Sequence, residues 1–338
     1  MGFLRWIQRR GRPPRRRDDK ELAALTERVT ALSPRLRLVP HYEKRLASRL
    51  GTAVEAIRAT VMGLPAPREA SEAAWADDPL IHAYFGTPAD VTRAFSRSPD
   101  LREFFDRKPQ VEWAYAVLGM AMNERRTLGV ALEGEVMHSD VPQTLVSFSD
   151  YQVRICAESD AALRTELVLR MLDQLAIEAM ARYAAGQGRR DTLERELGLL
   201  RAQLRLYERQ GAGLRSMVGG EVVDGTTVQA VRDEIASNDS ELAALGHAGD
   251  TLARQLECLG EVLGDAANRL HVERRRIRLS QVNVVLPADS TVPGDDLELL
   301  CAHVPGDPPV VRWFSIVRYA RAGMLSQATL LDEAARML

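Results

Sequence analysis

Apolar residues spaced alternately three and four positions apart constrain the fold of this chain more than any other feature. From Val228 to Leu270, eleven of the thirteen positions in this frame are apolar, and Asn238 and Gly249 are the exceptions. Such a repeat keeps one stripe of a helix facing a partner helix, as in a coiled coil. The sequence therefore predicts a long helix here that pairs with another helix.

The preceding stretch carries the same repeat, in which Leu193, Leu197, Leu200 and Leu204 are in frame. Between the two stretches, residues 216–227 contain the Gly-Gly and Asp-Gly pairs that are typical of turns. We expect an antiparallel coiled-coil hairpin over 161–276 with its tip loop at 216–227. Folding the chain at residue 221 places Asn238 near Leu204, and a seam asparagine fixes register at a cost in stability. A coiled coil between two copies, hence a homo-oligomer, is the alternative.

The residues before the hairpin carry helix signals. A capping residue precedes a proline at Ser33-Pro34, Thr87-Pro88 and Ser98-Pro99, and proline is favoured in the first turn of a helix. We expect helices near residues 19–31, 41–62, 69–85, 88–97, 99–106 and 109–125.

Two separate segments alternate with period two, which indicates strands. Residues 128–157 predict a β-hairpin, and residues 278–286, 297–304 and 310–319 predict three further strands before a final helix at about 325–337. We therefore expect an α+β fold that is predominantly helical, with a small antiparallel sheet of about five strands. The expected parts are a basic and apolar tail (1–18), a helical domain (19–126), an α+β body (127–160 plus 277–338) and the coiled-coil hairpin that interrupts it (161–276).

The amino terminus is strongly basic, since the first seventeen residues hold seven arginines and no acid while the whole chain carries a formal net charge of −2. Arginines next to apolar side chains suit an anchor on an anionic membrane surface, and a disordered tail or a protein-docking arm is the main alternative. The same arginines could neutralise nucleic-acid phosphates, although no recognition helix or RNA-binding motif follows them. The residues concerned are Phe3, Leu4, Trp6, Ile7, Arg9, Arg10, Arg12, Arg15, Arg16 and Arg17.

Several function classes lack their motifs. No Walker A loop, G-x-G-x-x-G, H-E-x-x-H, C-x-x-C or G-x-S-x-G is present, so we expect no cofactor. Three scattered cysteines do not make a disulfide framework or a structural zinc site. The amino terminus does not fit a signal peptide, and the longest apolar run is about half of the ~20 residues that span a bilayer. A cytoplasmic protein, peripheral to the inner membrane at most, is expected.

Three further groups are candidates for function. Glu133, Glu135, His138 and Asp140 in the β-hairpin could serve a metal or acid–base chemistry, with His303 approaching them, although their spacing matches no ligand signature and a solvated hairpin end explains them better. The arginines of residues 274–278 fit a solvated helix end. At the hairpin tip, four apolar side chains have no core to enter, so they either pack against one another or bind a partner, which makes them candidates for a partner site: Met217, Val218, Val222 and Val223.

A long arm on a small body provides reach, which a catalytic pocket does not need. We therefore expect a non-enzymatic structural or adaptor protein whose arm reaches a protein partner and whose amino terminus tethers it to a membrane. Two alternatives stay open: a nucleic-acid-associated protein that uses the arginine-rich arm, and an enzyme with an unrecognised site in the α+β body.

Overall fold

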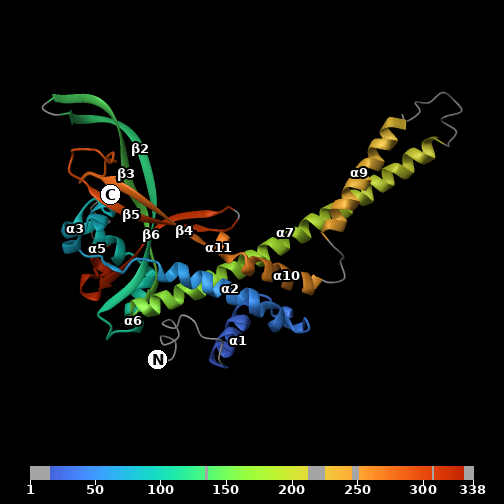
Figure 1. Cartoon of the computed structure of the whole chain (residues 1–338), viewed down its shortest axis with the longest axis horizontal. Helices are drawn as coiled ribbons and strands as arrows, with labels where there is room; N and C mark the ends of the chain where they lie inside the picture. The colour runs from blue at the N-terminus through green and yellow to red at the C-terminus, as the bar shows by residue number, and fades with distance from the viewer. Residues whose placement is uncertain (1–15, 134–135, 212–224, 246–250, 307, 331–338) are drawn as a thin grey trace. The chain divides into compact units, whose positions relative to one another are not determined.

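A computed structural model describes residues 16–133, 136–211, 225–245, 251–306 and 308–330 (Figure 1). The chain forms two compact units. One, the sheet unit, comprises residues 1–19, 51–174 and 265–338, and the other, the helical unit, comprises residues 20–50 and 175–264. The fold is α+β, as predicted. No helix in the described ranges is long and apolar enough to cross a membrane.

The sheet unit holds one sheet with the strand order β3-β2-β6-β5-β4 (Figure 1). All neighbours along this path are antiparallel, and the two-residue strand β1 (Arg68–Glu69) pairs parallel to β6. Two chain segments far apart in sequence build this one sheet, as predicted. The strand bounds are β2 Trp113–Glu133, β3 Val136–Ala157, β4 His271–Leu279, β5 Asp295–Val304 and β6 Val310–Ala320.

The helix predicted at residues 109–125 is wrong, because most of that segment is strand β2. Ala114, Ala116, Leu118 and Met120 are completely buried on one face of the sheet, and the alternate residues Tyr115 and Val117 pack against a second apolar cluster on the other face. A strand covered on both faces reads as a continuous apolar run without period two. The local sequence therefore resembled that of a helix, but packing on both faces stabilises a strand.

The second half of the expected hairpin also ends earlier than predicted. Helix α10 (Thr251–Gly264) and the single turn α11 (Ala266–Arg269) are followed at once by strand β4, so residues 271–276 are not helical. The strand predicted at 278–286 is wrong beyond Leu279, where β4 ends.

A short segment after β4 links the two edges of the sheet. Val285 N–H donates to Thr144 O and Val146 N–H donates to Asn283 O, while Leu286 N–H donates to Arg278 O. The segment thus pairs with β3 on one side and with the end of β4 on the other. The sheet is curled strongly enough for its two edge strands to share one bridging segment.

Strand β3 is bent by irregularities in its pairing with β2. Register shifts fall near three residues of β3 with positive φ, namely Asp140, Asp150 and Ile155. A β-bulge adds one unpaired residue to a strand and increases its local twist. These bulges account for the curvature of the long β2–β3 hairpin (Figure 1).

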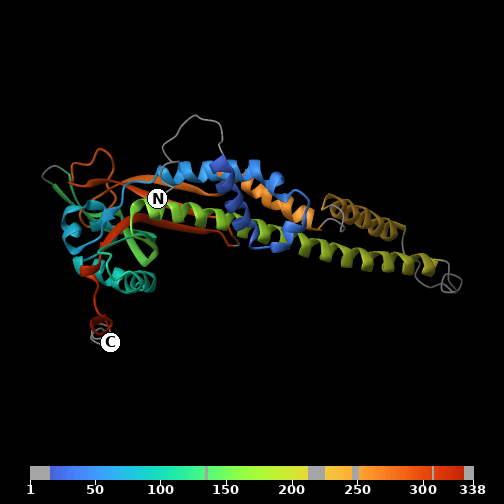
Figure 2. The ribbon, with the colours of Figure 1, turned by 90° about the horizontal axis from the view of Figure 1, so that it is seen from below.

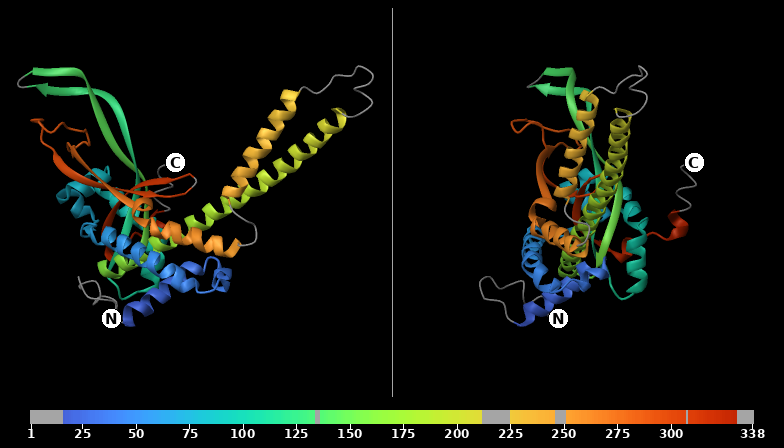
Figure 3. Two further views of the ribbon diagram at one scale, coloured as in Figure 1. Left: turned by 45° about the vertical axis from the view of Figure 1, so that its right-hand side comes forward. Right: turned by 90° about the vertical axis from the view of Figure 1, so that its right-hand side faces the viewer.

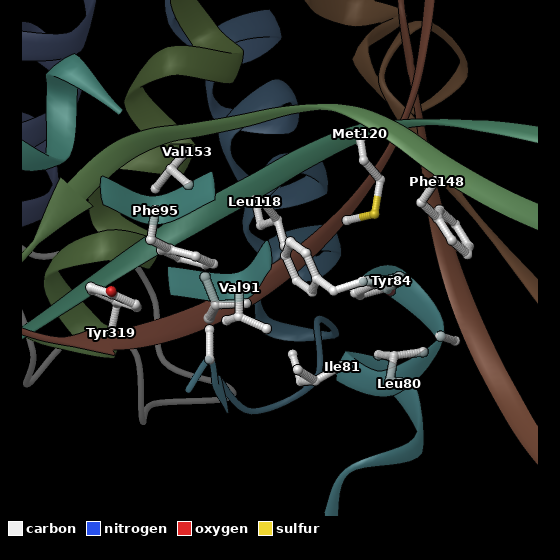
Figure 4. Close-up of a cluster of buried hydrophobic side chains, with 14 of the residues drawn as sticks. Leu80, Ile81, Tyr84, Val91, Phe95, Leu118, Met120, Phe148, Val153 and Tyr319 are labelled. Carbon is white, nitrogen blue, oxygen red and sulfur yellow. The ribbon is translucent and has the colours of Figure 1, made fainter. Parts of the chain in front are cut away.

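Four short helices cover one face of the sheet and complete its core. Figure 4 shows Ile81 and Phe95 of these helices among side chains of β2, β3 and β6. Phe95 is completely buried and stacks on Tyr319 of β6, with ring centroids 4.6 Å apart. The helices are α3 (Glu72–Asp77), α4 (Pro79–Tyr84), α5 (Pro88–Ser96) and α6 (Pro99–Arg107). The helix predicted at 69–85 is therefore split, because Asp78 caps α4 by accepting from the N–H groups of Leu80 and Ile81. The Asp78-Pro79 pair is the same start signal that correctly marked α5 and α6.

The helical unit is built around the distal part of α7 (Asp160–Gly211). Helix α10 lies beside α7 (Figure 2). Between them, Gln255 Nε2 donates to Met180 Sδ at 3.0 Å and Cys258 Sγ donates to Ala179 O at 3.4 Å. Arg49 forms an ion pair with Glu257 of α10 at 2.7 Å. The remaining elements are α1 (Arg16–Thr30), η1 (Pro34–Leu38), α2 (Tyr42–Met62), which continues into the sheet unit, and α9 (Gly225–Ala244).

Two ends of the chain complete the description. The helices predicted at 19–31 and 41–62 are confirmed by α1 and α2. After β6 and the short turn η3 (Arg321–Gly323), residues 327–330 are helical, and the rest of the helix predicted at 325–337 lies outside the described residues. The sequence-based domain boundaries stay a prediction.

Candidate functional site: the paired helices

Helices α7 and α9 lie side by side and antiparallel in the helical unit (Figure 3). Arg189 Nη2 lies 2.7 Å from Glu241 Oε2, and Arg201 Nη2 lies 2.9 Å from Asp239 Oδ1. From the first contact to the second, the residue number rises along α7, from 189 to 201, and falls along α9, from 241 to 239, as in antiparallel helices. We refer to residues 189–205 of α7 and 225–245 at α9 as the paired helices.

Burial in the paired helices follows the apolar repeat. Leu193, Leu197 and Val231 are buried, and the other frame positions, which include Leu200, Leu204 and Ile235, are half-buried. Leu199 is outside the frame and is 72% exposed. The side chains that the pairing shelters are therefore mainly those that the 3-4 repeat selects.

The register differs from the predicted one. Asn238 Nδ2 donates to Glu196 Oε2 at 3.4 Å, so Asn238 lies about two helical turns from the predicted neighbour Leu204. A heptad repeat is satisfied equally well when one helix slides by seven residues along the other, so the apolar stripe alone cannot choose. In the structure the ion pairs of Arg189 and Arg201 accompany the observed register.

The two helices carry opposite charge. Residues 189–205 hold five arginines and three acids, whereas residues 225–245 hold one arginine and four acids. Opposite charges on facing helices favour this pairing over association of like helices. The ion pairs are about half exposed, so each contributes little stability and mainly orients the helices.

The tip and tail candidates cannot be placed. The four tip residues Met217, Val218, Val222 and Val223 lie outside the described residues, as do the tail residues up to Arg15. Arg16 and Arg17 belong to the first turn of α1. Partner, lipid and phosphate binding at these positions stay predictions.

The candidate metal or acid–base group in the β-hairpin also lies mostly outside the described residues. Glu135 and the side chains of Glu133 and His138 lie outside the described residues, and Asp140 is exposed at a bulge with φ 64°. His303 instead stacks on His271 of β4, with ring centroids 4.5 Å apart, and its Nε2 lies 3.1 Å from Glu273 Oε2. Within the described residues, no three His, Cys, Asp or Glu side chains are grouped to hold a metal ion.

The arginine cluster expected at a helix end is on strand β4 instead. Arg274 Nη1 donates to Glu298 Oε1 at 2.9 Å and Arg275 pairs with Glu124 at 2.5 Å, while Arg278 donates to the carbonyl of Ala288. The helix interpretation was wrong because a run of charged residues has no apolar period that would distinguish a helix from a strand. In the strand, Arg274 and Arg275 link β4 to β5 and to β2 through their ion pairs.

One hollow of about 430 Å³ in the sheet unit contains a cysteine that the sequence did not single out. It lies between α6, the end of β3 and the start of α7, and the bulge at Ile155 precedes Cys156. Burial raises the pKa of the Cys156 thiol to about 12, with Asp100 adding to the shift, so the thiolate needed for nucleophilic attack is scarce. The cations of the hollow are paired: Arg107 with Glu103, Lys108 with Glu158 and Arg170 with Glu166.

Comparisons with known proteins add no assignment: no family model, no curated protein and no solved structure matches this chain. A function for this chain therefore has to be inferred from its own geometry.

Proposed function

We propose that the chain is an adaptor that uses the paired helices as a coiled-coil arm to reach a protein partner. The observation that carries this proposal is the burial pattern of the paired helices, where a single apolar stripe is sheltered and most other side chains are exposed. An element that contributes to a core would bury more than one stripe. Two helices that pair through one seam form a stiff extension and need only a small buried apolar surface to do so.

The antiparallel hairpin is part of this proposal and has its own test. Light and isotopically heavy chains carrying Glu196→Cys and Asn238→Cys are mixed and treated with a short bismaleimide, and the linked peptides are identified by mass spectrometry. Leu204→Cys with Asn238→Cys is the matched control. A link within one chain for 196 and 238, and a weaker one for 204 and 238, supports the hairpin; mixed light–heavy links as the main product would show a coiled coil between copies.

The reach of the arm is tested by shortening it in register. Deleting residues 192–205 and 230–243 removes two heptads from each helix, and the 3-4 frame continues across both junctions. A photo-crosslinking residue in place of Val222 is compared in the full and shortened chains, with Asp289 in the sheet unit as the control position. A discrete protein captured from position 222 of the full chain, and lost on shortening, supports the adaptor. Capture that is equal at 289, or unchanged by shortening, contradicts it.

The tether is the second part of the proposal. Apolar and arginine side chains within residues 1–17 suit an anionic lipid surface, where each cation near the surface contributes about 1 kcal/mol. Flotation with anionic and with neutral liposomes, with and without residues 1–17, tests this part. Binding to anionic liposomes that the deletion abolishes is expected, and binding that survives the deletion would remove the tether from the proposal.

A further inference from the structure

A second hollow, of about 360 Å³, lies in the helical unit between α7 and α10. We call it the arginine groove. Helix α7 contributes Arg182, Tyr183, Gly186, Gln187 and Arg190, and α10 contributes Arg254, Glu257, Cys258 and Glu261, while Leu245 closes one end. Its volume is within the range of small-molecule sites, at the lower end.

Within the part of the chain that the structure describes, the groove lining has two arginines without a partner against one such carboxylate, the exposed Glu261. Among the described residues Arg182 and Arg254, one from each helix, make no ion pair or hydrogen bond. Glu257 is already engaged from outside the groove by Arg49 at 2.7 Å and Arg45 at 3.6 Å. This state differs from the hollow at Cys156, where each arginine and lysine has a carboxylate partner.

A third guanidinium and two neutral polar groups line the same groove. Arg190 donates through Nε to Glu194 at 2.9 Å, and its side chain is only 13% exposed, so its position is fixed by the surrounding helices. Gln187 Nε2 donates to Tyr183 Oη at 2.9 Å, which leaves the phenol proton available to a ligand. Guanidinium groups present planar N–H pairs that match the oxygens of phosphate and carboxylate.

Gly186 keeps the groove open. A glycine inside a helix lowers its stability relative to alanine. A Cβ built on Gly186 meets nothing within 4 Å. Steric exclusion therefore does not explain this glycine, and its effect is to leave space between Arg182 and Arg190 on the groove wall.

We infer that the arginine groove binds a small oxyanion ligand, of the phosphate or carboxylate class, through Arg182 and Arg254. Arg190 and the Tyr183 hydroxyl complete the set of donors. Two cations on two different helices bind such a ligand more tightly when the helices are held together, so occupancy stabilises the contact of α7 with α10. The inference does not rest on the adaptor proposal, because Arg182 and Arg254 lie outside the paired helices; only Arg190 and Leu245 are shared, at the ends of those helices.

Isothermal titration of the full chain with pyrophosphate and, separately, with citrate tests the inference. Sodium chloride at matched ionic strength serves as the blank. We expect saturable binding of at least one probe, and about tenfold weaker binding for each of Arg182→Gln and Arg254→Gln, since each removes a charge-assisted hydrogen bond. Arg205→Gln, an exposed arginine on the same helix outside the groove, is the matched control and is expected to bind like the unaltered chain.

A filled groove provides a second variant that does not depend on charge. Gly186→Leu places a side chain into the open space and improves helix propensity, so the protein is expected to unfold at a higher temperature while binding is lost. Binding of pyrophosphate alone assigns a phosphate ligand, and binding of citrate alone assigns a carboxylate. The inference is overturned by absence of saturable binding to both probes, by equal weakening in Arg205→Gln, or by full binding in Gly186→Leu.

Discussion

The sheet unit and the paired helices bury their apolar side chains in different ways. In the sheet unit, side chains from β2, β6 and the covering helices meet in one cluster, and residues such as Phe95 and Leu118 are completely enclosed. In the paired helices, Leu197 is buried while Leu199, two residues away, is 72% exposed. The sheet unit buries its apolar residues in one core formed by several elements. The paired helices bury a single apolar stripe, and most of their remaining surface is exposed.

The largest expected effect is in the core of the sheet unit. Phe95→Ala removes a ring that stacks on Tyr319 and is enclosed on all sides, which should lower the free energy of unfolding by about 3–5 kcal/mol. Urea denaturation followed by circular dichroism measures this loss. Leu199→Ala is the matched control on the paired helices, and its exposure predicts a change within about 0.5 kcal/mol. Equal losses for the two variants would remove the distinction between the regions.

A smaller loss is expected at the seam. Leu197→Ala should cost about 2–3 kcal/mol, the lower part of the range for buried leucines, because a two-helix seam is open to water along both sides. Hydrogen exchange resolves where the loss occurs. Faster exchange is expected at the amides of residues 189–205 and 225–245, with the strand amides of the sheet unit unchanged. Faster exchange throughout the chain would mean that the paired helices are not a separate stability unit.

The same difference explains how much of the fold the sequence could predict. An amphipathic stripe is written directly into the sequence, and so are capping residues followed by proline; the burial of Leu193 and Val231 and the starts of α5 and α6 were therefore predictable. Strand β2 was not, because Ala114 to Met120 are buried on both faces and carry no alternation. Secondary structure that depends on contacts with distant segments leaves little local signal.

The sites show the same limit. The seam position of Asn238 could be predicted, but its neighbour could not, since a heptad repeat permits a slide of seven residues. The arginine groove was missed because Arg182 and Arg254 are far apart in sequence and are brought together by the pairing of two helices. The available signal is Gly186, a glycine inside the long helix, which marks an interruption of the repeat but does not indicate a ligand.

The smallest expected effect concerns an ion pair and depends on pH. The hydrogen bond from Arg49, opposed by partial burial and aided by the charges of Arg49 and Arg45, lowers the pKa of Glu257. A carboxyl whose pKa is lower in the folded chain stabilises it above the unfolded pKa, about 4.3, and loses that contribution as the pH falls through the folded value. Because the side chain of Glu257 is 45% exposed, screening limits the effect to at most about 0.5–1 kcal/mol.

Glu257→Gln should therefore be slightly less stable than the unaltered chain at pH 7 and equally stable near pH 3, as measured by urea midpoints at both values. Glu261→Gln, one turn further along α10, is the control, because Glu261 is exposed and has no described partner. A difference for Glu257→Gln that persisted at pH 3 would mean that packing of the side chain, and not its charge, holds α10 against α2. Charge would then matter less in the helical unit than its exposed ion pairs indicate, and the contrast with the sheet unit would rest on the apolar seam alone.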